Sequence, residues 1–263
     1  MSELYSFSKL TAFDTCPQMW SLTYLDHAPK QKGVFSEYGT LVHSILERYE
    51  KGELPITALS DIFEWEWDQT FRGMKWPPNK YVDLESSYKE KGIAFFQSFD
   101  GFRQDEGINI LGVEQHFEFP IDDFSMQGYI DLVFEHNGKL VVQDWKTAKK
   151  YTKAELAYKV RQPYLYSRWV KDTFGRFPDE IRFHHTKDNV IVVIPFDTNK
   201  YQEAIDWSKS QVEKIRSTWI FPENPDEFFC CNICSVRGSC KCGDGNYWKE
   251  QRIRKEMHKR KEL

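Results

Sequence analysis

Asp131, Asp144 and Lys146 combine residue types and spacing that suit metal-assisted cleavage of a phosphodiester bond. Carboxylate oxygens are the ligands that Mg²⁺ prefers, and such a site usually takes one or two of them together with water and substrate phosphate. A bound cation can activate water and neutralise the negative charge that develops during the reaction. A lysine beside the cation could hold the attacking water. An ordinary hairpin with a surface aspartate and an Asp–Lys ion pair would contain the same three residues.

A β-hairpin is predicted to position these side chains. Residues 129–143 are rich in β-branched and aromatic residues on both sides of Asn137-Gly138, which is a strong hairpin turn signal. If the two strands pair, Asp131 near the start of the first lies across the ladder from Asp144 at the end of the second. Lys146 then points to the same side as Asp144, because side chains two residues apart share a face of a strand.

The hairpin resembles the core motif of the PD-(D/E)XK nuclease superfamily, written here as Gly128-x-x-Asp131 and Asp144-Trp145-Lys146. The resemblance implies that the two aspartates bind Mg²⁺ or Mn²⁺ and that the lysine assists the attacking water. It makes Asp131, Asp144 and Lys146 the expected catalytic residues. It also implies an α/β fold with a restriction-endonuclease-like core, in which helices flank a mixed sheet.

Four further residues resemble positions of the RecB-like branch of the superfamily. Residues 39–47 look like the helix of that branch in which a histidine, here His43, supplies a metal contact. Gln162 and Tyr166 match its Gln-x-x-x-Tyr motif, which lies near the active site and helps to position DNA, and their spacing puts them on one helix face. Glu114 stands where many relatives carry an acidic residue, which could complete the metal shell. A core histidine and a solvated surface acid are the alternative interpretations of His43 and Glu114.

The six cysteines are the second informative feature. One stands near the N-terminus and five gather near the C-terminus, at positions 230, 231, 234, 240 and 242. Cys16 precedes a proline, which looks like the Cys-Pro start of the iron-sulfur members of this branch, typified by AddB-type and CRISPR-adaptation nucleases. In those proteins one N-terminal and three C-terminal cysteines hold a [4Fe-4S] cluster. The resemblance therefore implies Cys16, Cys231, Cys234 and Cys240 as cluster ligands.

A metal held by these four cysteines would be a structural staple. It would close a loop of more than two hundred residues and so restrict the unfolded chain, and four thiolates suit either an iron-sulfur cluster or Zn²⁺. Cys230 and Cys242 are extras that could replace a neighbour or remain free thiols. A disulfide framework is the third alternative, but the first ten residues contain Glu3 and Lys9 and no apolar signal-peptide core.

The composition predicts a cytoplasmic globular enzyme. The 263 residues can bury a substantial core, and no apolar run approaches the about 18 residues that span a membrane. The formal net charge of −4 argues against a generally basic surface for nucleic acid, so contacts to DNA must be local. Basic stretches lie at residues 146–150 and 252–261. Phosphate contacts from such stretches bind without base specificity and weaken with salt.

We expect one nuclease domain over residues 1–263, because the chain shows no repeat, low-complexity segment or long linker. Within the N-terminal part, residues 10–25 are predicted to be a helical start that carries Cys16. The aromatic residues of the helical insertion are expected mainly in its core. The expected parts are N-terminal helices over 1–50, a helical insertion over 51–108, the catalytic sheet over 109–200, and a C-terminal helix with the metal-stapled cysteine cluster as a terminal subdomain over 201–263.

Together with the resemblance, these features predict a metal-dependent DNA nuclease, most simply an exonuclease acting on single-stranded DNA or on DNA with free ends. Such a nuclease would serve recombination, repair, phage DNA processing or CRISPR adaptation. The sequence contains no helicase motif, so unwinding would come from a helicase, recombination or CRISPR-integration partner. A catalytically weak DNA-binding or assembly subunit and a zinc-stapled endonuclease are the rival interpretations.

Overall fold

The chain folds into two compact units. The computed structural model describes residues 3–101, 107–224 and 226–259, with side chains described as far as Ile253. One unit, here called the sheet unit, comprises Met1–Phe7 and Tyr38–Gln211, and the other, the terminal unit, comprises Ser8–Glu37 and Val212–Leu263. The terminal unit therefore joins the two ends of the chain, and it contains all six cysteines.

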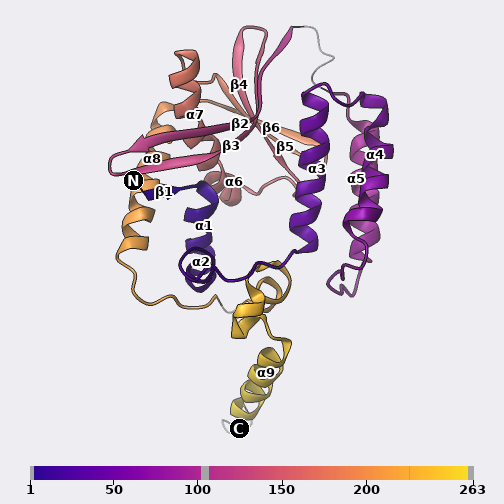
Figure 1. Cartoon of the computed structure of the whole chain (residues 1–263), viewed down its shortest axis with the longest axis vertical. Coiled ribbons are helices and arrows are strands. Elements are labelled where there is room, and N and C mark those ends of the chain that lie inside the picture. Colours follow the sequence, from indigo (N-terminus) through magenta and orange to yellow (C-terminus); the bar gives the residue numbers. More distant parts are fainter. Residues whose placement is uncertain (1–2, 102–106, 225, 260–263) are drawn as a thin grey trace. The chain divides into compact units, whose positions relative to one another are not determined.

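Six strands within the described residues form one mixed sheet in the sheet unit (Figure 1). The order is β1-β3-β4-β5-β6, and β2 pairs with the other edge of the long strand β3. The β1–β3 and β4–β5 pairs are parallel and the other pairs are antiparallel, which confirms the predicted mixed sheet flanked by helices. The strands are β1 Glu3–Tyr5, β2 Ile108–Ile121, β3 Phe124–His136, β4 Lys139–Lys146, β5 Glu180–His185 and β6 Val190–Pro195.

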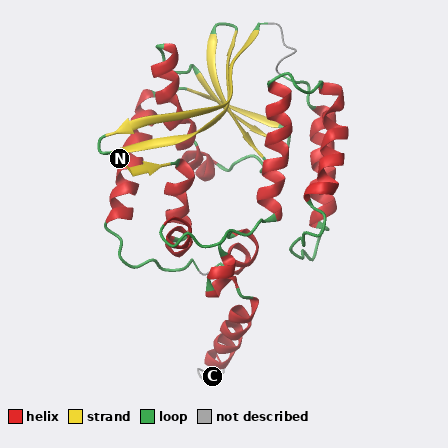
Figure 2. Ribbon diagram, in the orientation of Figure 1, coloured by secondary structure: helices red, strands yellow, loops and turns green. Residues whose placement is uncertain are grey.

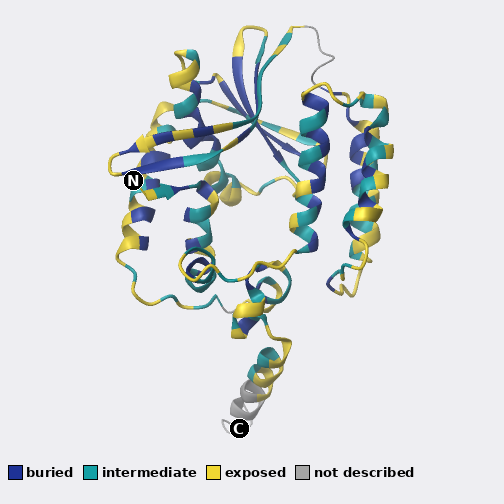
Figure 3. Cartoon of the chain, in the orientation of Figure 1, coloured by how far each residue is buried: buried dark blue, intermediate teal, exposed yellow. Residues whose placement is uncertain are grey.

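The β3–β4 hairpin turns at Asn137 and Gly138, as the sequence predicts. Their φ angles of 51° and 77° are the two successive positive values that a two-residue turn between twisted strands requires. β4 is buried along almost its whole length (Figure 3), because helices cover the sheet on both sides of this strand. A buried central strand gives the residues at its C-terminal end a fixed position.

Two helices connect the parallel strands β4 and β5, since a parallel pair needs a crossover. α6 (Lys153–Lys159) begins with a capping box in which Thr152 and Glu155 satisfy each other's backbone N–H groups. α7 (Arg161–Phe174) ends at Gly175, whose φ of 74° allows the left-handed helix stop. α7 packs on β2, β3 and β4, so it covers the face of the sheet near the end of β4.

The remaining helices of the sheet unit include the predicted insertion. α4 (Leu59–Thr70) and α5 (Leu84–Ser98) pack against each other, and Figure 2 shows them with α3 (Val34–Glu50). The ring of Tyr38 on α3 contacts aromatic rings of both insertion helices, so these aromatic residues form a core, as predicted. Trp65 and Tyr81 are exceptions in the insertion, with 66% and 81% of their surfaces exposed. The last long helix is α8 (Thr198–Arg216).

The terminal unit begins with the helical region expected over residues 10–25. It consists of two helices, α1 (Phe7–Thr15) and α2 (Pro17–Tyr24), with Cys16 between them. Cys16 is extended (φ −161°, ψ 102°), because Pro17 disfavours a helical conformation in the residue before it. The C-terminal part holds the short turns η3 (Phe229–Ile233), η4 (Arg237–Ser239) and η5 (Lys241–Gly243), followed by α9 (Gly245–Lys259). Within the described residues, no helix has both the length and the apolar character to cross a membrane.

Candidate functional site

Three carboxylates lie in one row across β2, β3 and β4. The β3–β4 ladder ends one pair before Asp131 and Asp144, which occupy the next opposing positions. On the other side of β3, the β2 ladder skips Glu114, which stands opposite Asp131 between two paired positions. Directly opposing residues of antiparallel strands are close neighbours. The hairpin therefore has the predicted register, and the preceding strand adds a third acid at the same level.

Glu114 has a strained backbone. Its φ of 47° lies in the left-handed region that residues with side chains rarely adopt, and the β2–β3 register shifts nearby, between Ile110 and Gly112. Such a conformation costs about 1–3 kcal/mol and clusters at functional sites. Neither Asp131 nor Asp144 has a positive φ. The distortion of β2 therefore accompanies the placement of the Glu114 carboxylate beside the hairpin.

His43 reaches this row from α3. Its Nδ1 atom lies 3.7 Å from Asp131 Oδ2, and one donor atom from each of His43, Glu114 and Asp131 lies within 4.8 Å of the other two. Asp131 Oδ2 also accepts a hydrogen bond of 2.7 Å from the backbone N–H of Trp145, which orients the carboxylate. These donors fit a divalent cation, and the two carboxylates favour Mg²⁺ or Mn²⁺. Asp144 lies outside this group of three.

The acids of the row repel one another. Burial, followed by the charges of Asp131 and Glu47, raises the pKa of Glu114 to about 7. Burial and the neighbouring Asp144 carboxylate also raise the pKa of Asp131, although His43 and Lys146 oppose the shift. Both raised pKa values result from several negative charges that lie close together in a site with little access to solvent. A bound divalent cation would relieve this excess, so the electrostatics of the site fit the donor set.

Lys146 is held by two side chains at the end of β4. Its Nζ atom forms an ion pair with the buried Asp144 carboxylate and donates a hydrogen bond of 3.1 Å to Gln162 Oε1 on α7. Burial alone would lower the pKa of Lys146, but the attraction of Asp144, Tyr151 and Asp131 together outweighs burial, and the pKa is raised. The lysine is therefore a fixed positive charge next to the row of acids.

The Gln162–Tyr166 pair lies in this site, with Gln162 directly on Lys146. Gln162 Nε2 donates a hydrogen bond to the Tyr166 hydroxyl, so Tyr166, Gln162 and Lys146 form a chain of contacts. Tyr166 is buried, and its ring packs on Phe117 with 5.1 Å between ring centroids. Burial and the charges of Asp144 and Asp131 raise the pKa of Tyr166 well above its usual value. Their expected part in placing DNA stays a prediction.

Two residues near the site were not singled out from the sequence. Glu47 lies one helical turn after His43 on α3, and its charge raises the pKa of Glu114. Its spacing of four from His43 was a usable signal, because such residues share a helix face. Tyr151 lies close enough to Lys146 and Asp144 to interact electrostatically with both, and burial raises its pKa to about 12. Tyr151 follows β4 in a loop, where no periodic pattern indicates its direction.

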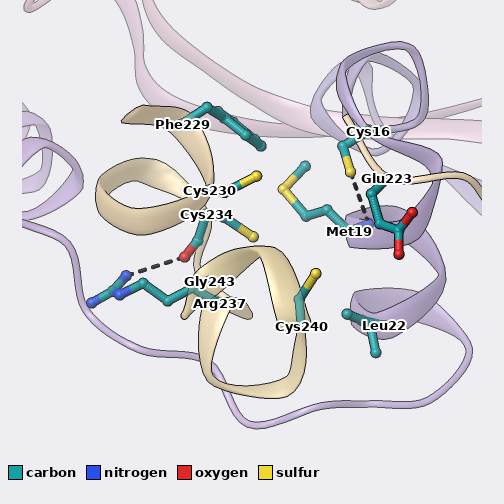
Figure 4. Close-up of a pocket in the computed structure, with 10 residues that line it drawn as sticks. All are labelled: Cys16, Met19, Leu22, Glu223, Phe229, Cys230, Cys234, Arg237, Cys240 and Gly243. Carbon is teal, nitrogen blue, oxygen red and sulfur yellow. Dashed lines mark hydrogen bonds between the residues drawn. The ribbon is translucent and has the colours of Figure 1, made fainter. Parts of the chain in front are cut away.

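Four cysteines line one pocket in the terminal unit (Figure 4). They are Cys16, Cys230, Cys234 and Cys240, and the apolar side chains of Met19, Leu22 and Phe229 lie beside them. Three of these cysteines are among the four expected from the sequence, but Cys230 takes the place of Cys231. The Cys231 thiol instead lies 3.8 Å from the carbonyl oxygen of Cys242. Among the described residues, no three cysteine sulfurs lie within 4.8 Å of one another.

The sulfur of Cys16 is surrounded by backbone donors. The N–H groups of Met19 and Asn224 each donate to Cys16 Sγ at 3.4 Å, although these two residues are more than two hundred positions apart. The Cys16 side chain also caps α2, so the break in the N-terminal helix places this sulfur at the pocket.

A family match covers most of the chain. The sequence model of the PD-(D/E)XK nuclease superfamily matches residues 5–241. The chain belongs to this superfamily. In a PD-(D/E)XK nuclease the named motif comprises one acid followed by a second acid and a lysine two positions later, and Asp131, Asp144 and Lys146 follow this pattern on β3 and β4. The protein is therefore a nuclease, a hydrolase of nucleic acid.

The PD-(D/E)XK nuclease has phage relatives. The "Gene 69 protein" of Mycobacterium phage D29 is 26% identical over 275 aligned residues, which cover 90% of this chain and 96% of the phage protein. The "Gene 69 protein" of Mycobacterium phage L5 is 26% identical over 187 residues, covering 55% of this chain and 64% of that protein. The crystal structure of a "Putative exonuclease" from Eubacterium rectale matches with a TM-score of 0.54 and 14% identity, covering 91% of this chain and 88% of the other. This last likeness shows a shared fold.

Proposed function

We propose that this PD-(D/E)XK nuclease is a Mg²⁺- or Mn²⁺-dependent deoxyribonuclease of the RecB-like branch. It acts as an exonuclease on single-stranded DNA or on DNA with free ends. The observation that carries the proposal is the row of Glu114, Asp131 and Asp144, with Lys146 paired to its last member. Buried acids that repel one another, next to a fixed lysine, are suited to a cation and a phosphate group.

The proposed metal ligands come from four different elements. His43 lies on α3, Glu114 on β2, Asp131 on β3 and Asp144 on β4. When bound, the cation supplies the chemistry of lowering the pKa of a water molecule and neutralising charge on the phosphate. Because each ligand is fixed by a separate element, the donor set depends on the assembled sheet unit. A local defect in β2 would therefore disturb the metal site as much as one in the hairpin.

Lys146 is proposed to hold the attacking water and to stabilise the negative charge of the phosphate in the transition state. Asp144, Tyr151 and Asp131 together keep the pKa of Lys146 raised despite its burial, so the Lys146 amine carries a proton at neutral pH. A protonated amine can donate hydrogen bonds but cannot accept a proton. Lys146 therefore acts as a donor that positions oxygen atoms, and Gln162 fixes its direction. Gln162 and Tyr166 would border the bound strand at the same phosphate.

The comparisons support the choice of pathway and mode of action within the proposal. The phage relatives favour phage DNA processing among the processes that the sequence allows. The name of the Eubacterium rectale neighbour supports exonuclease action, in line with the resemblance to RecB-like proteins. Any unwinding of duplex DNA would be supplied by a helicase or recombination partner, because the sequence has no helicase motif.

The terminal unit is proposed to hold a [4Fe-4S] cluster. Four thiols around one pocket, with apolar neighbours, provide the ligand number of such a cluster. The resemblance to the iron-sulfur members of the RecB-like branch favours this cluster over a single Zn²⁺ ion, which four thiolates could also hold. The cluster would act as a structural staple between the two ends of the chain.

The nuclease is tested by cleavage of end-labelled linear single-stranded DNA with Mg²⁺ or Mn²⁺. The parent should release label, and Lys146→Ala should lower the rate about a hundredfold or more, because a donor to the transition state is lost. Lys139→Ala is the matched control. Lys139 is the first residue of β4 and Lys146 is the last. Like Lys146, Lys139 forms an ion pair with a carboxylate, which is that of Glu180. Equal loss of activity in both variants, or full activity in Lys146→Ala, would contradict the proposed role.

The mode of cleavage is tested with circular single-stranded DNA of the same sequence. An exonuclease needs an end, so the circle should remain intact under conditions that degrade the linear strand. Cleavage of the circle at a similar rate would identify an endonuclease. Comparing 5′-labelled with 3′-labelled linear strands then gives the direction of degradation from the order in which label and product lengths appear.

A further inference from the structure

The turn η3 places two adjacent cysteines differently. Cys230 lines the pocket with Cys16, Cys234 and Cys240, whereas Cys231 does not (Figure 4). η3 is a π-helical turn, closed by a hydrogen bond of 2.9 Å from Cys234 N–H to the carbonyl of Phe229, five residues earlier. In this wider turn, residues four apart lie closer to one face than residues three apart. Cys230 and Cys234 are four apart, and Cys231 and Cys234 are three apart.

The two thiols also have different partners. Cys230 is buried, with 5% of its surface exposed, and its thiol donates to the carbonyl oxygen of Asn224 at 3.2 Å. Asn224 is the residue whose N–H group donates to Cys16 Sγ, so both thiols share one neighbour. Cys231 faces the start of α9, where its thiol and the indole N–H of Trp248 both approach the Cys242 carbonyl.

We infer that Cys230, and not Cys231, completes the four-thiolate ligand set with Cys16, Cys234 and Cys240. The inference rests on the metal centre proposed above for the terminal unit, and it is independent of the nuclease chemistry of the sheet unit. It changes the ligand spacing from Cys-x-x-Cys to Cys-x-x-x-Cys in this chain. It assigns Cys231 to packing between η3 and α9.

Adjacent cysteines provide a closely matched pair of variants. Cys230→Ser and Cys231→Ser differ from the parent by the same atom, one residue apart, and both are purified under anaerobic conditions. Iron, acid-labile sulfide and zinc are quantified per chain, together with absorbance near 400 nm and the unfolding temperature. Cys230→Ser should lose most of its metal and unfold at a lower temperature, whereas Cys231→Ser should match the parent in both.

Four results would overturn the inference. Loss of metal from Cys231→Ser with retention in Cys230→Ser would assign the ligand to Cys231, and loss from both would make both residues necessary. Full retention in Cys230→Ser would exclude it as a ligand. A parent that contains neither iron and sulfide nor zinc would remove the metal centre and this inference with it. The cleavage assay and its Lys146→Ala variant would still decide the nuclease proposal separately.

A measurement on the parent covers the case in which Cys230→Ser does not fold. The folded protein is treated with iodoacetamide before and after the metal is removed, and mass spectrometry locates the alkylated cysteines. Cys16, Cys230, Cys234 and Cys240 should become reactive together after metal removal, while the reactivity of Cys231 should not change. Metal-dependent protection of Cys231, or protection of Cys230 that does not depend on metal, would contradict the assignment.

Discussion

Glu114 and Asp131 stand opposite each other on β2 and β3, and the Asp131 charge is the largest influence after burial on the raised pKa of Glu114. This pairing of two acids across strands is unfavourable without a cation. It is combined with a left-handed φ at Glu114. The metal-free sheet unit is therefore locally destabilised at the place where the metal is proposed to bind. The next two predictions follow from this destabilisation.

The stability of the metal-free protein should depend on Glu114. The pKa of Glu114 is raised to about 7 in the folded protein, above the ordinary value of 4.5. The contribution of Glu114 to the free energy of unfolding is therefore fully present below pH 4.5, and it is lost as the pH rises through about 7. Urea unfolding of the sheet unit without divalent cations should show this loss, and Glu114→Gln should remove it. Glu64→Gln, at an exposed position on α4, is the control. An unchanged pH profile in Glu114→Gln would contradict the assignment.

Metal affinity should follow the opposite trend with pH. The cation binds the ionised carboxylates, so Mn²⁺ binding should strengthen from pH 5 to pH 8 with release of protons. Titration followed by electron paramagnetic resonance measures the free Mn²⁺. Glu114→Gln should weaken binding about tenfold or more and make it less dependent on pH. If the variant binds Mn²⁺ as the parent does at all pH values, Glu114 is not a ligand.

Gln162 should act through Lys146. Gln162→Ala removes the hydrogen bond to Lys146 Nζ, and a misplaced lysine should lower kcat by about tenfold to a hundredfold with little change in affinity for DNA. Tyr166→Phe keeps the ring packed on Phe117 and removes only the hydroxyl that contacts Gln162, so its effect should be smaller. Single-turnover rates and DNA binding by anisotropy separate the two quantities. A weaker affinity with an unchanged rate would instead support a DNA contact.

Gly128 should be required by packing. A Cβ atom at this position would lie 2.8 Å from two ring carbons of Phe117, so Gly128→Ala should lower the free energy of unfolding by about 1–3 kcal/mol. Gly112→Ala on β2 is the control, because its Cβ would meet Gln115 at an ordinary 3.5 Å. Adding Phe117→Leu should restore part of the loss in Gly128→Ala. Equal unfolding midpoints for both glycine variants would contradict this account.

Lys149 and Lys150 should contribute phosphate contacts. Both are exposed and lie in the loop that follows β4. Replacing both by Ala should make the dependence of log K on log salt shallower by about 1.4 for single-stranded DNA, since each phosphate contact contributes about 0.7. Anisotropy titrations in the Asp144→Ala background avoid cleavage. Lys200→Ala, at an exposed lysine paired with Glu203, is the control and should leave the slope unchanged.

Local patterns predicted the hairpin and its acids because a two-residue turn fixes the register of the strands it joins. Asn137 and Gly138 therefore determine that Asp131 faces Asp144. The start of β3 was not predicted, because the strand begins at Phe124 and its first part pairs with β1, a strand of three residues. A pairing between segments more than a hundred residues apart leaves no periodic signal in either.

The other features depend on three-dimensional paths that a sequence pattern does not specify. The contact between Gln162 and Lys146 requires the course of the β4–β5 crossover, so the motif indicated a shared helix face but not its partner. The orientation of Cys230 depends on the π-helical turn, which has no recognisable residue pattern. The break at Cys16 could have been predicted, because Pro17 disfavours a helical conformation at the residue before it. The helical spacing of the residues on both sides gave no sign of this break.

The composition of the terminal unit has a consequence for synthesis on the ribosome. Residues Ser8–Glu37 emerge first, but the segment that completes their unit begins only at Val212. At about 5–20 residues per second, roughly 9 to 35 seconds pass before synthesis reaches this segment. During that interval the Cys16 thiol has none of the other five cysteines beside it. Metal loading would therefore be the last step of maturation, and a chain truncated before Cys230 would be left with an unpaired thiol at its start.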